Sequence, residues 1–173
     1  MKKWDEVFTK IKPEEIKDNV FDLIGYEWFL ISAGTTDSFN TMTASWGTTG
    51  VFWNKPISIC FVRPTRHTFN FMEESDVYTL SFLGTQNKTI HKVCGSKSGR
   101  DTDKIKETGL KPVVTENGSI TYEQARLVLE CKKVYFDDLK PVFILPDDID
   151  EKFYPDMDYH RMYFGEILNV YQK

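Results

Sequence analysis

The sequence predicts a mainly β protein, a small β-barrel with a few short helices at its periphery. Seven or so short apolar segments, separated by turn residues, have the length and composition of β-strands. They do not alternate with helices as a doubly wound sheet requires, and the chain has no Gly-rich nucleotide-binding turn or phosphate loop. Many short strands with short inserted helices are typical of a small barrel.

The expected strands begin after Tyr26, where apolar residues come in short runs rather than at helical spacing. They cover approximately residues 28–31, 40–47, 51–53, 57–62, 77–83, 125–136 and 162–171. Short helices are expected from Thr65 or Thr68 and over residues 86–94, with Gly95 as a helix stop. Residues 146–158, acidic and interrupted by proline, are expected to form a surface loop.

The N-terminal segment differs from the rest because its apolar residues have helical spacing. Trp4, Val7, Phe8 and Ile11 fall at i, i+3, i+4 and i+7, before Pro13. The pattern predicts a short amphipathic helix over residues 3–11. We expect residues 1–20 to form a helical arm outside the barrel, available to dock on a partner subunit.

Length and composition indicate one well-folded domain over residues 1–173. Of the 173 residues, 40% are hydrophobic and 14% aromatic, and there is no repeat, linker or low-complexity tract. The net charge of −4 argues against nucleic acid as a partner, because no net positive field attracts its phosphates. No apolar run approaches the roughly 20 residues of a membrane-spanning helix. No apolar signal-peptide core follows Met1. Neither a membrane-spanning helix nor a signal peptide is therefore expected.

The three cysteines, Cys60, Cys94 and Cys131, are widely spaced and odd in number. No pair has the spacing of a zinc knuckle or a redox dithiol. We expect reduced thiols buried as small hydrophobic groups, and a cytoplasmic location.

Residues 40–47 show the clearest pattern for binding a ligand. Read as a strand, the segment separates apolar side chains from small hydroxyls. The two faces carry Met42, Ala44 and Trp46, and Thr41, Thr43 and Ser45. A planar ring with a polar edge can lie against such a row of hydroxyls. A solvent-facing strand edge explains the same residues equally well, since Thr is a good strand former.

Two basic clusters are candidate sites for an anion. The first, residues 63–68, has two arginines and two threonines where a strand ends and a helix begins. The second, residues 96–104, combines a glycine for close backbone approach with an arginine and two lysines, and Asp101 or Thr102 can cap the next helix. Each cluster alone is typical of an ordinary basic loop. Two of them in an acidic protein favour an anionic ligand.

The histidines do not form a catalytic set with any Ser, Cys or Asp, and no catalytic residue is assigned. His67 belongs to the first basic cluster, His91 is expected on an exposed helix face, and His160 is the best candidate to line a pocket. Asp156 and Asp158 precede His160 without the spacing of a recognised metal site, so no metal is expected.

Four motifs follow one another in the chain. They are Asn-Thr-Met-Thr-Ala-Ser-Trp-Gly at 40–47, Arg-Pro-Thr-Arg-His-Thr at 63–68, Ser-Gly-Arg-Asp-Thr-Asp-Lys at 98–104 and His-Arg-Met-Tyr-Phe-Gly-Glu-Ile at 160–167. Together they resemble the flavin reductase-like family, and most closely its flavoredoxin type. The similarity runs from about Phe21 to the C-terminus. Each motif alone is a weak signal, whereas four in the family's order are a strong one.

The resemblance implies a split β-barrel that binds FMN non-covalently, usually as a homodimer with its sites near the subunit interface. Residues implied to face or flank the isoalloxazine ring are Asn40, Thr41, Thr43, Ser45 and Trp46, with Phe164 beside it. Residues implied to surround the ribityl-phosphate are Arg63, Arg66 and Thr68, with Ser98 and Lys104 closing on the phosphate. Met42, Ala44 and His160 complete the candidate cofactor-binding set. His67 stands where relatives often carry an aromatic residue such as Tyr.

A flavin carries out hydride and electron transfer itself, which is why a catalytic triad is not required. The first hypothesis is an FMN-dependent oxidoreductase of the NAD(P)H:flavin reductase type. It passes a hydride from NAD(P)H, or electrons from a redox protein partner, through FMN. The alternatives are an FMN-binding electron carrier without its own NAD(P)H activity, and a split-barrel binding protein that has lost flavin.

Overall fold

The computed structural model describes residues 1–173, except for the side chain of Asp147. The strands are β1 (Lys2–Lys3), β2 (Thr9–Ile11), β3 (Phe29–Gly34), β4 (Phe39–Ala44), β5 (Gly47–Phe52), β6 (Lys55–Val62), β7 (Val77–Phe82), β8 (Pro112–Val114), β9 (Ile120–Tyr122), β10 (Leu127–Asp138) and β11 (Arg161–Gln172). The α-helices are α1 (His67–Glu74), α2 (Lys88–Ser96), α3 (Lys104–Thr108) and α4 (Asp147–Phe153). Single 3₁₀ turns occupy Trp4–Glu6, Pro13–Glu15, Thr85–Asn87 and Pro141–Phe143, and a π-helix spans Asp22–Glu27. The predicted mainly β class is confirmed.

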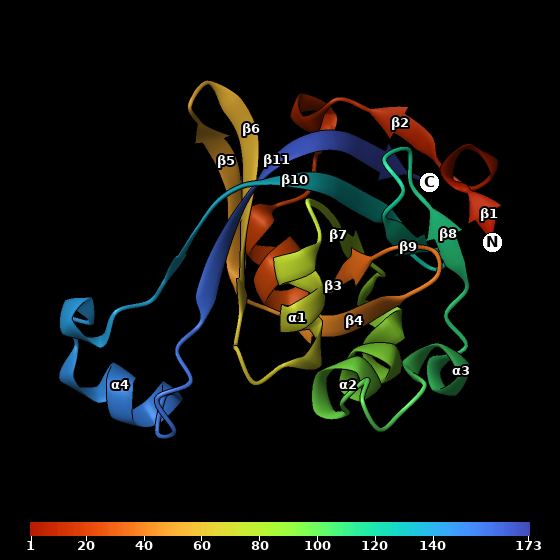
Figure 1. Ribbon diagram of the computed structural model, residues 1–173. Coiled ribbons are helices and arrows are strands. Elements are labelled where there is room, and N and C mark those ends of the chain that lie inside the picture. Colours follow the sequence, from red (N-terminus) through yellow and green to blue (C-terminus); the bar gives the residue numbers. More distant parts are fainter.

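The strands form two sheets, and the larger one organises the molecule (Figure 1). Its order is β4-β3-β7-β10-β11-β6-β5, with β2 joined to β11. A smaller sheet has the order β1-β8-β9. Strands β4 and β5 follow each other in the chain but lie at opposite edges of the large sheet. The two residues between them, Ser45 and Trp46, therefore link the two edges.

That link explains why the predicted continuous strand over residues 40–47 is wrong. Strand β4 ends at Ala44, and β5 begins at Gly47 to pair with Cys60 of β6. The next turn closes the β5–β6 hairpin through Trp53 and Asn54, whose φ angles are 52° and 57°. Two successive residues with positive φ are typical of a two-residue hairpin turn that matches the twist of its strands.

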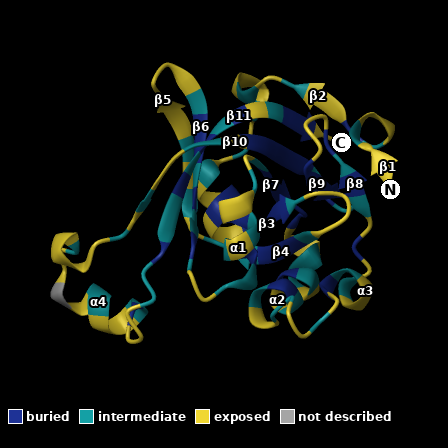
Figure 2. Ribbon diagram, viewed as in Figure 1, coloured by how far each residue is buried: buried dark blue, intermediate teal, exposed yellow. Residues whose placement is uncertain are grey.

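Both faces of the central strands are buried, so two cores form. Alternate residues of β3, β7 and β10, such as Ile31, Leu80 and Leu129, point into one core. Leu30 and Val128 point the other way, into a second core under the small sheet and helices α2 and α3. Figure 2 shows the buried central strands. The three cysteines are all free and buried, as predicted.

The short helix predicted over residues 3–11 is wrong, and so is the helical arm predicted over residues 1–20. Thr9–Ile11 is strand β2, which pairs antiparallel with β11. Trp4 and Phe8 lie against Tyr171 of the same chain, with ring centroids 5.1 Å and 6.4 Å apart. The free edge of β11 supplies backbone partners that periodicity cannot reveal, and pairing with it overrides the helical spacing.

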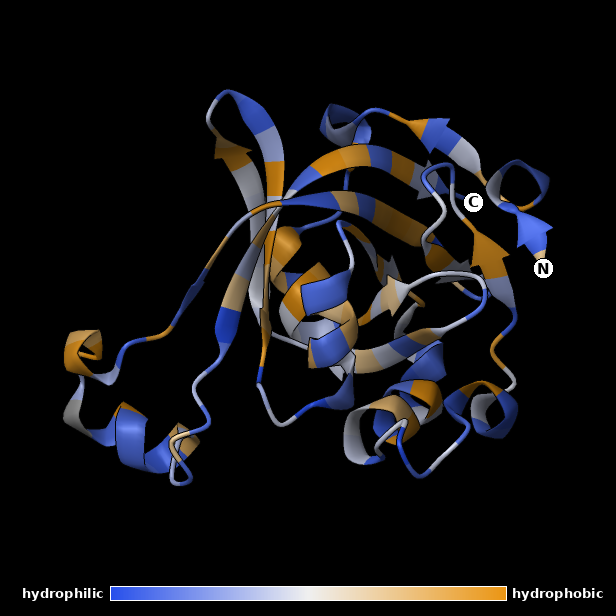
Figure 3. Cartoon of the chain, viewed as in Figure 1, coloured by the Kyte–Doolittle hydropathy of each residue, from blue (hydrophilic) through white to orange (hydrophobic). Residues whose placement is uncertain are grey.

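Between β10 and β11 the chain makes an excursion over residues 139–160, away from the barrel (Figure 1). This segment was expected to be a surface loop from residue 146 onward, but residues 147–153 form helix α4. Pro146 precedes the helix and Asp148 lies in its first turn, where a negative charge is favoured. Figure 3 shows hydrophobic residues in the excursion, and Val142, Phe143 and Leu145 are all exposed.

Candidate functional site

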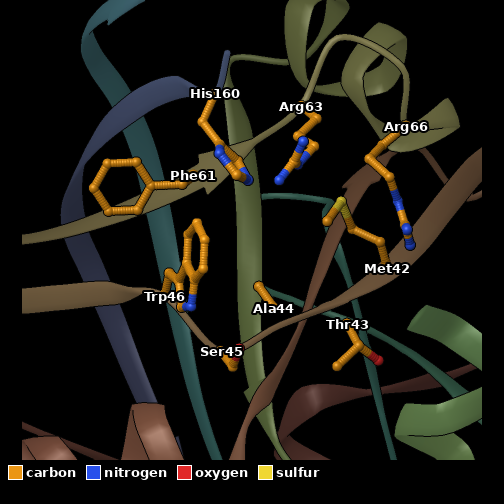
Figure 4. A pocket seen from close by; sticks show the side chains of 9 residues that line it. All are labelled: Met42, Thr43, Ala44, Ser45, Trp46, Phe61, Arg63, Arg66 and His160. Carbon is orange, nitrogen blue, oxygen red and sulfur yellow. The ribbon is translucent and has the colours of Figure 1, made fainter. Parts of the chain in front are cut away.

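A cavity of about 220 Å³ opens beside the link between β4 and β5 (Figure 4). We call it the Trp46 cavity. It is lined by Met42, Thr43, Ala44, Ser45, Trp46, Phe61, Arg63, Arg66 and His160. Five consecutive residues line it because the chain turns from strand to link there, so that both faces of the segment reach the same space. All the predicted residues from 42 to 46 are brought together at this point.

One side of the Trp46 cavity is aromatic. The indole of Trp46 lies 5.2 Å from the imidazole of His160 and 5.4 Å from the ring of Phe153, measured between ring centroids. His160 and Phe153 both come from the excursion over residues 139–160. The cavity therefore lies between the barrel and the excursion. Trp46 remains 42% exposed, which leaves its ring available to a ligand.

Two of the three hydroxyls in the predicted row are not free, and only Ser45 is left to line the cavity without a bond to another described residue. Thr41 is 1% exposed, and its Oγ1 donates to the Ile31 carbonyl and accepts from Ser32. Thr43 Oγ1 donates to the carbonyl of His91 at 2.7 Å. These hydroxyls are taken up within the protein, because β4 is covered by β3 and helix α2. The polar edge of any ligand here must find other partners.

His91 was expected on an exposed helix face, and this expectation is wrong. It is 1% exposed and packs edge-on against Trp28. Burial, and then the charge of Lys88, lower the pKa of His91 to about 4. The imidazole is therefore neutral at pH 7, which a buried side chain without a carboxylate partner requires.

A second pocket lies on the other side of Arg66, where the two basic clusters meet. We call it the Lys104 pocket. It is lined by Thr65, Arg66, His67, Thr68, Ser96, Lys97, Ser98, Arg100 and Lys104. Its volume is about 170 Å³. Clusters that are some 30 residues apart in sequence come together because α1 and α2 both pack against β4. Since Arg66 lines both spaces, the Trp46 cavity and the Lys104 pocket adjoin at its side chain.

Lys104 is the most buried cation of this pocket, at 5% exposed. Its Nζ donates to the carbonyls of Thr41 and Cys94, at 2.7 Å and 3.2 Å. Neither acceptor is charged, so burial lowers the pKa of Lys104 to about 8. The predicted cap of the following helix is displaced by one or two residues, since Asp103 rather than Asp101 or Thr102 accepts from the Lys106 N–H.

Two further groups in the Lys104 pocket lack a charged hydrogen-bond partner among the described residues. Arg66 donates to the Cys94 carbonyl at 3.3 Å and has no carboxylate partner among the described residues, and burial lowers its pKa. His67 Nδ1 is shielded from solvent, with no hydrogen-bond partner in the described part of the chain. His67 and Thr68 begin helix α1, whose N-terminal N–H groups favour an anion.

Asn40 is hydrogen-bonded to Thr68, one of the residues that line the Lys104 pocket. Asn40 Nδ2 donates to Thr68 Oγ1 at 2.8 Å, and both residues are buried. A Cβ on Gly99 would collide with Asn40 Oδ1, so the 98–100 turn can approach only as glycine. Ser98 Oγ accepts the Arg100 N–H and stabilises that turn. Asn40, implied to flank the ring, thus lies on the side of the Lys104 pocket instead.

Arg63 and Arg66 are three residues apart but have different surroundings. Arg63 forms an ion pair with Asp158 and donates to the Phe153 carbonyl at 2.7 Å. It lines the Trp46 cavity and not the Lys104 pocket, although it was implied to surround the phosphate. Asp158 belongs to the excursion, so its position opposite Arg63 had no signal in the sequence.

Phe164 is not brought into either space. It lines a separate pocket with Phe52, Ile57 and Ile59, on the hairpin of β5 and β6. Conversely, Phe61 lines the Trp46 cavity without having been singled out. Its position on β6, two residues before Arg63 on the same face of the strand, is the signal that points to it.

Comparison with known proteins agrees with this architecture. The chain is similar in structure to flavoredoxin from Methanosarcina acetivorans, with 22% identity and a TM-score of 0.66 over 95% of this chain and 76% of that chain. It is also similar to flavoredoxin of Desulfovibrio vulgaris (Miyazaki F), with 19% identity and a TM-score of 0.66 over 94% of this chain and 77% of that chain. An FMN-binding protein from Thermus thermophilus is 17% identical with a TM-score of 0.67, over 94% of this chain and 80% of that chain. No curated protein matches this sequence.

These likenesses confirm the split β-barrel predicted from the sequence. None of the helices in the described residues has the length and apolar character needed to span a membrane. The Flavin reductase like domain family matches residues 21–173, which is nearly the whole chain. The chain therefore belongs to the Flavin reductase like domain family.

Proposed function

We propose that this protein binds FMN and acts as an oxidoreductase, which passes a hydride from NAD(P)H, or electrons from a redox protein partner, through the flavin. Membership of the Flavin reductase like domain family supports the proposal. Structural likeness to proteins named as flavoredoxins and as FMN-binding supports the same cofactor. The residues then have to offer a place for a flat ring and for a phosphate.

The two adjoining spaces fit these two ends of FMN. The Trp46 cavity offers the aromatic side chains of Trp46, Phe61 and His160 to the ring, and the Lys104 pocket offers cations to the phosphate. In this proposal, the ring is held by Met42, Thr43, Ala44, Ser45, Trp46 and His160. The phosphate is held by Arg66, Thr68, Ser98 and Lys104, with His67 as an added donor. The ribityl chain passes Arg66, which lines both spaces.

The observation that carries the proposal is that Lys104, Arg66 and His67 Nδ1 in the Lys104 pocket have no carboxylate partner among the described residues. A buried charge without a counter-charge costs free energy, because it loses its hydration without an opposite charge in return. Lys104 and Arg66 both show lowered pKa values for this reason. An anion bound between them supplies the missing charge and a partner for His67 Nδ1.

The chemistry of the bound group is hydride and electron transfer, which needs positioning and a suitable environment more than protein acids and bases. Trp46 and Phe61 offer their rings as a packing surface for the flavin. Arg66 and Lys104 hold the phosphate and thereby set the position of the ring in the Trp46 cavity. The absence of a Ser, His and Asp triad from the site is consistent with that division of work.

Anaerobic reductive titration of the purified protein tests the proposal. Stoichiometric yellow FMN on purification is expected, and its absence, together with no binding of added FMN, would favour a split-barrel protein that has lost flavin. Rapid bleaching by NADH or NADPH under nitrogen is expected for the oxidoreductase. If neither nicotinamide bleaches the flavin but reduced ferredoxin does, the protein is an electron carrier without NAD(P)H activity.

We further propose that residues 1–173 form one domain that pairs as a homodimer in the cytoplasm. Two exposed apolar surfaces support pairing, namely Val51, Phe52 and Trp53 at the β5–β6 turn, and Val142, Phe143 and Leu145 in the excursion. The three unpaired, buried cysteines suit a reducing compartment. Sedimentation equilibrium should give twice the monomer mass, and a monomer at micromolar concentration would contradict the pairing.

A further inference from the structure

Tyr154 and His160 form a buried pair at the outer wall of the Trp46 cavity. Tyr154 follows helix α4, His160 precedes β11, and the two side chains are 5% and 8% exposed. The Tyr154 hydroxyl lies 2.9 Å from His160 Nδ1. His160 reaches the cavity directly and Tyr154 does not line it. Figure 4 shows the imidazole next to Arg63, on the side of the cavity above Trp46.

The protonation of the two groups determines the direction of their hydrogen bond. Burial raises the pKa of Tyr154, so its hydroxyl keeps its proton. Burial, and then the charge of Arg63, lower the pKa of His160 to about 4, against a smaller opposing effect of Asp158. At pH 7 the imidazole is neutral, with one nitrogen that donates and one that accepts.

Only one of the two directions leaves no proton without an acceptor. His160 Nδ1 is the single hydrogen-bond partner of the Tyr154 hydroxyl among the described residues. If Nδ1 carried the proton, the phenolic hydrogen would be buried without an acceptor, which costs free energy. If Tyr154 donates to Nδ1, the proton of the imidazole lies on Nε2, the nitrogen that does not contact Tyr154.

The arginine next to His160 already has a counter-charge. Arg63 lies with its guanidinium carbon 5.1 Å from the centroid of the Tyr154 ring. Its charge is met by Asp158, and it also donates to the Phe153 carbonyl. A neutral N–H donor beside a compensated arginine and an indole suits a flat ring with an uncharged carbonyl oxygen.

We propose that Tyr154 is a positioning residue that holds His160 in its Nε2–H form, so that His160 donates a hydrogen bond to a carbonyl oxygen of the flavin ring in the Trp46 cavity. The inference rests on the proposed function for the identity of that ring. The tautomer of His160 does not depend on flavin and is measured without it.

The first test is the tautomer of His160, read from nitrogen-15 NMR of the flavin-free, full-length protein. The signal is assigned by its loss in His160→Gln. The wild type should show a bare Nδ1 and a protonated Nε2, and Tyr154→Phe should give a mixture of tautomers. Tyr159→Phe is the matched control, because Tyr159 stacks on Tyr154 with centroids 4.8 Å apart but bonds to Asp150. A protonated Nδ1 in the wild type, or an unchanged spectrum in Tyr154→Phe, overturns the proposal.

The second test follows the binding of FMN to the same protein. Addition of FMN should shift the His160 Nε2 signal, because that nitrogen donates to a carbonyl oxygen of the ring. Tyr154→Phe should raise the dissociation constant for FMN about two- to tenfold, roughly one hydrogen bond of about 0.5–1.5 kcal/mol. Tyr159→Phe should bind FMN as the wild type does. An Nε2 signal that does not respond to bound FMN, or equal affinities in wild type and Tyr154→Phe, overturns the ligand assignment. A protein that fails to bind FMN at all contradicts the proposed function and still gives the tautomer spectrum, so the two proposals fail separately.

Discussion

The Trp46 cavity and the Lys104 pocket adjoin at one arginine and differ in how their charges are compensated. In the cavity, the charge of Arg63 is met by Asp158, and one side is formed by the rings of Trp46, Phe61 and His160. In the pocket, Arg66 and Lys104 donate hydrogen bonds to backbone carbonyls and to no carboxylate of the described residues. The charge of Arg63 needs no ligand to neutralise it. A bound anion would stabilise the Lys104 pocket by neutralising the charges of Arg66 and Lys104. We infer that the pocket supplies most of the affinity for FMN and that the cavity controls what happens at its ring.

The largest effect is expected from removing the buried charge. Lys104→Met should raise the dissociation constant for FMN by about 10- to 100-fold, because a hydrogen bond to a charged group contributes about 1.5–3 kcal/mol. Isothermal titration measures the change. Lys106→Met, an exposed lysine on the same helix, should bind FMN as the wild type does. Normal FMN retention by Lys104→Met, with normal thermal unfolding, would show that the phosphate lies elsewhere.

The same lysine predicts how FMN affinity depends on pH. The pKa of Lys104 in the free protein is about 8, and the protonated amine is the form that binds an anion. Above that pKa, binding must take up a proton, so affinity falls as pH rises, by at most about tenfold per pH unit. Titrations at pH 7, 8 and 9 should show the decline in the wild type. An equal decline in Lys104→Met would assign it to another group.

A smaller effect is expected at the ring. Trp46→Ala should raise the dissociation constant for FMN by about two- to tenfold, because an aromatic contact contributes about 0.5–1.5 kcal/mol. It should also change the absorption spectrum and the potential of the bound flavin. Riboflavin, which lacks the phosphate, separates the two regions. Trp46→Ala should weaken riboflavin and FMN alike, and Lys104→Met should weaken FMN alone. The opposite result would exchange the roles of cavity and pocket.

The smallest effect on binding is expected from the compensated arginine. Arg63→Gln should change the dissociation constant for FMN by no more than about twofold, since its charge is already neutralised and partly exposed ion pairs contribute about 1 kcal/mol or less. Its melting temperature should fall, because Asp158 and the Phe153 carbonyl lose their donor. A loss of FMN affinity as large as that of Lys104→Met would show that Arg63 reaches the phosphate.

Much of the site could be predicted because it lies in continuous motifs. Met42 to Trp46 line one cavity, and Arg66, Thr68, Ser98 and Lys104 line one pocket. These residues are close in space because short loops place them at the ends of neighbouring elements. Asp158, opposite Arg63, and Tyr154, bonded to His160, had no comparable signal, because both belong to the excursion whose path depends on packing.

Three errors have one cause, which is that local pattern does not show what covers a segment. Residues 3–11 have helical spacing but pair with the edge of β11. Thr41 and Thr43 were read as a free face, yet Ile31 and His91 accept their hydrogen bonds. His91 was read as exposed and lies buried beside Trp28. In each case a neighbour distant in sequence decides the outcome.

Composition and motif order, by themselves, determined that this protein is a mainly β barrel of the flavin reductase-like kind with basic clusters suited to an anion. They could do so because strand length, turn residues and charge are properties of short stretches of chain. Only the tertiary structure decided which cations keep an uncompensated charge, which hydroxyls remain free and which tautomer His160 adopts. Those properties depend on burial and on partners brought from other strands, and the free energy of a charge or a proton is set by what surrounds it.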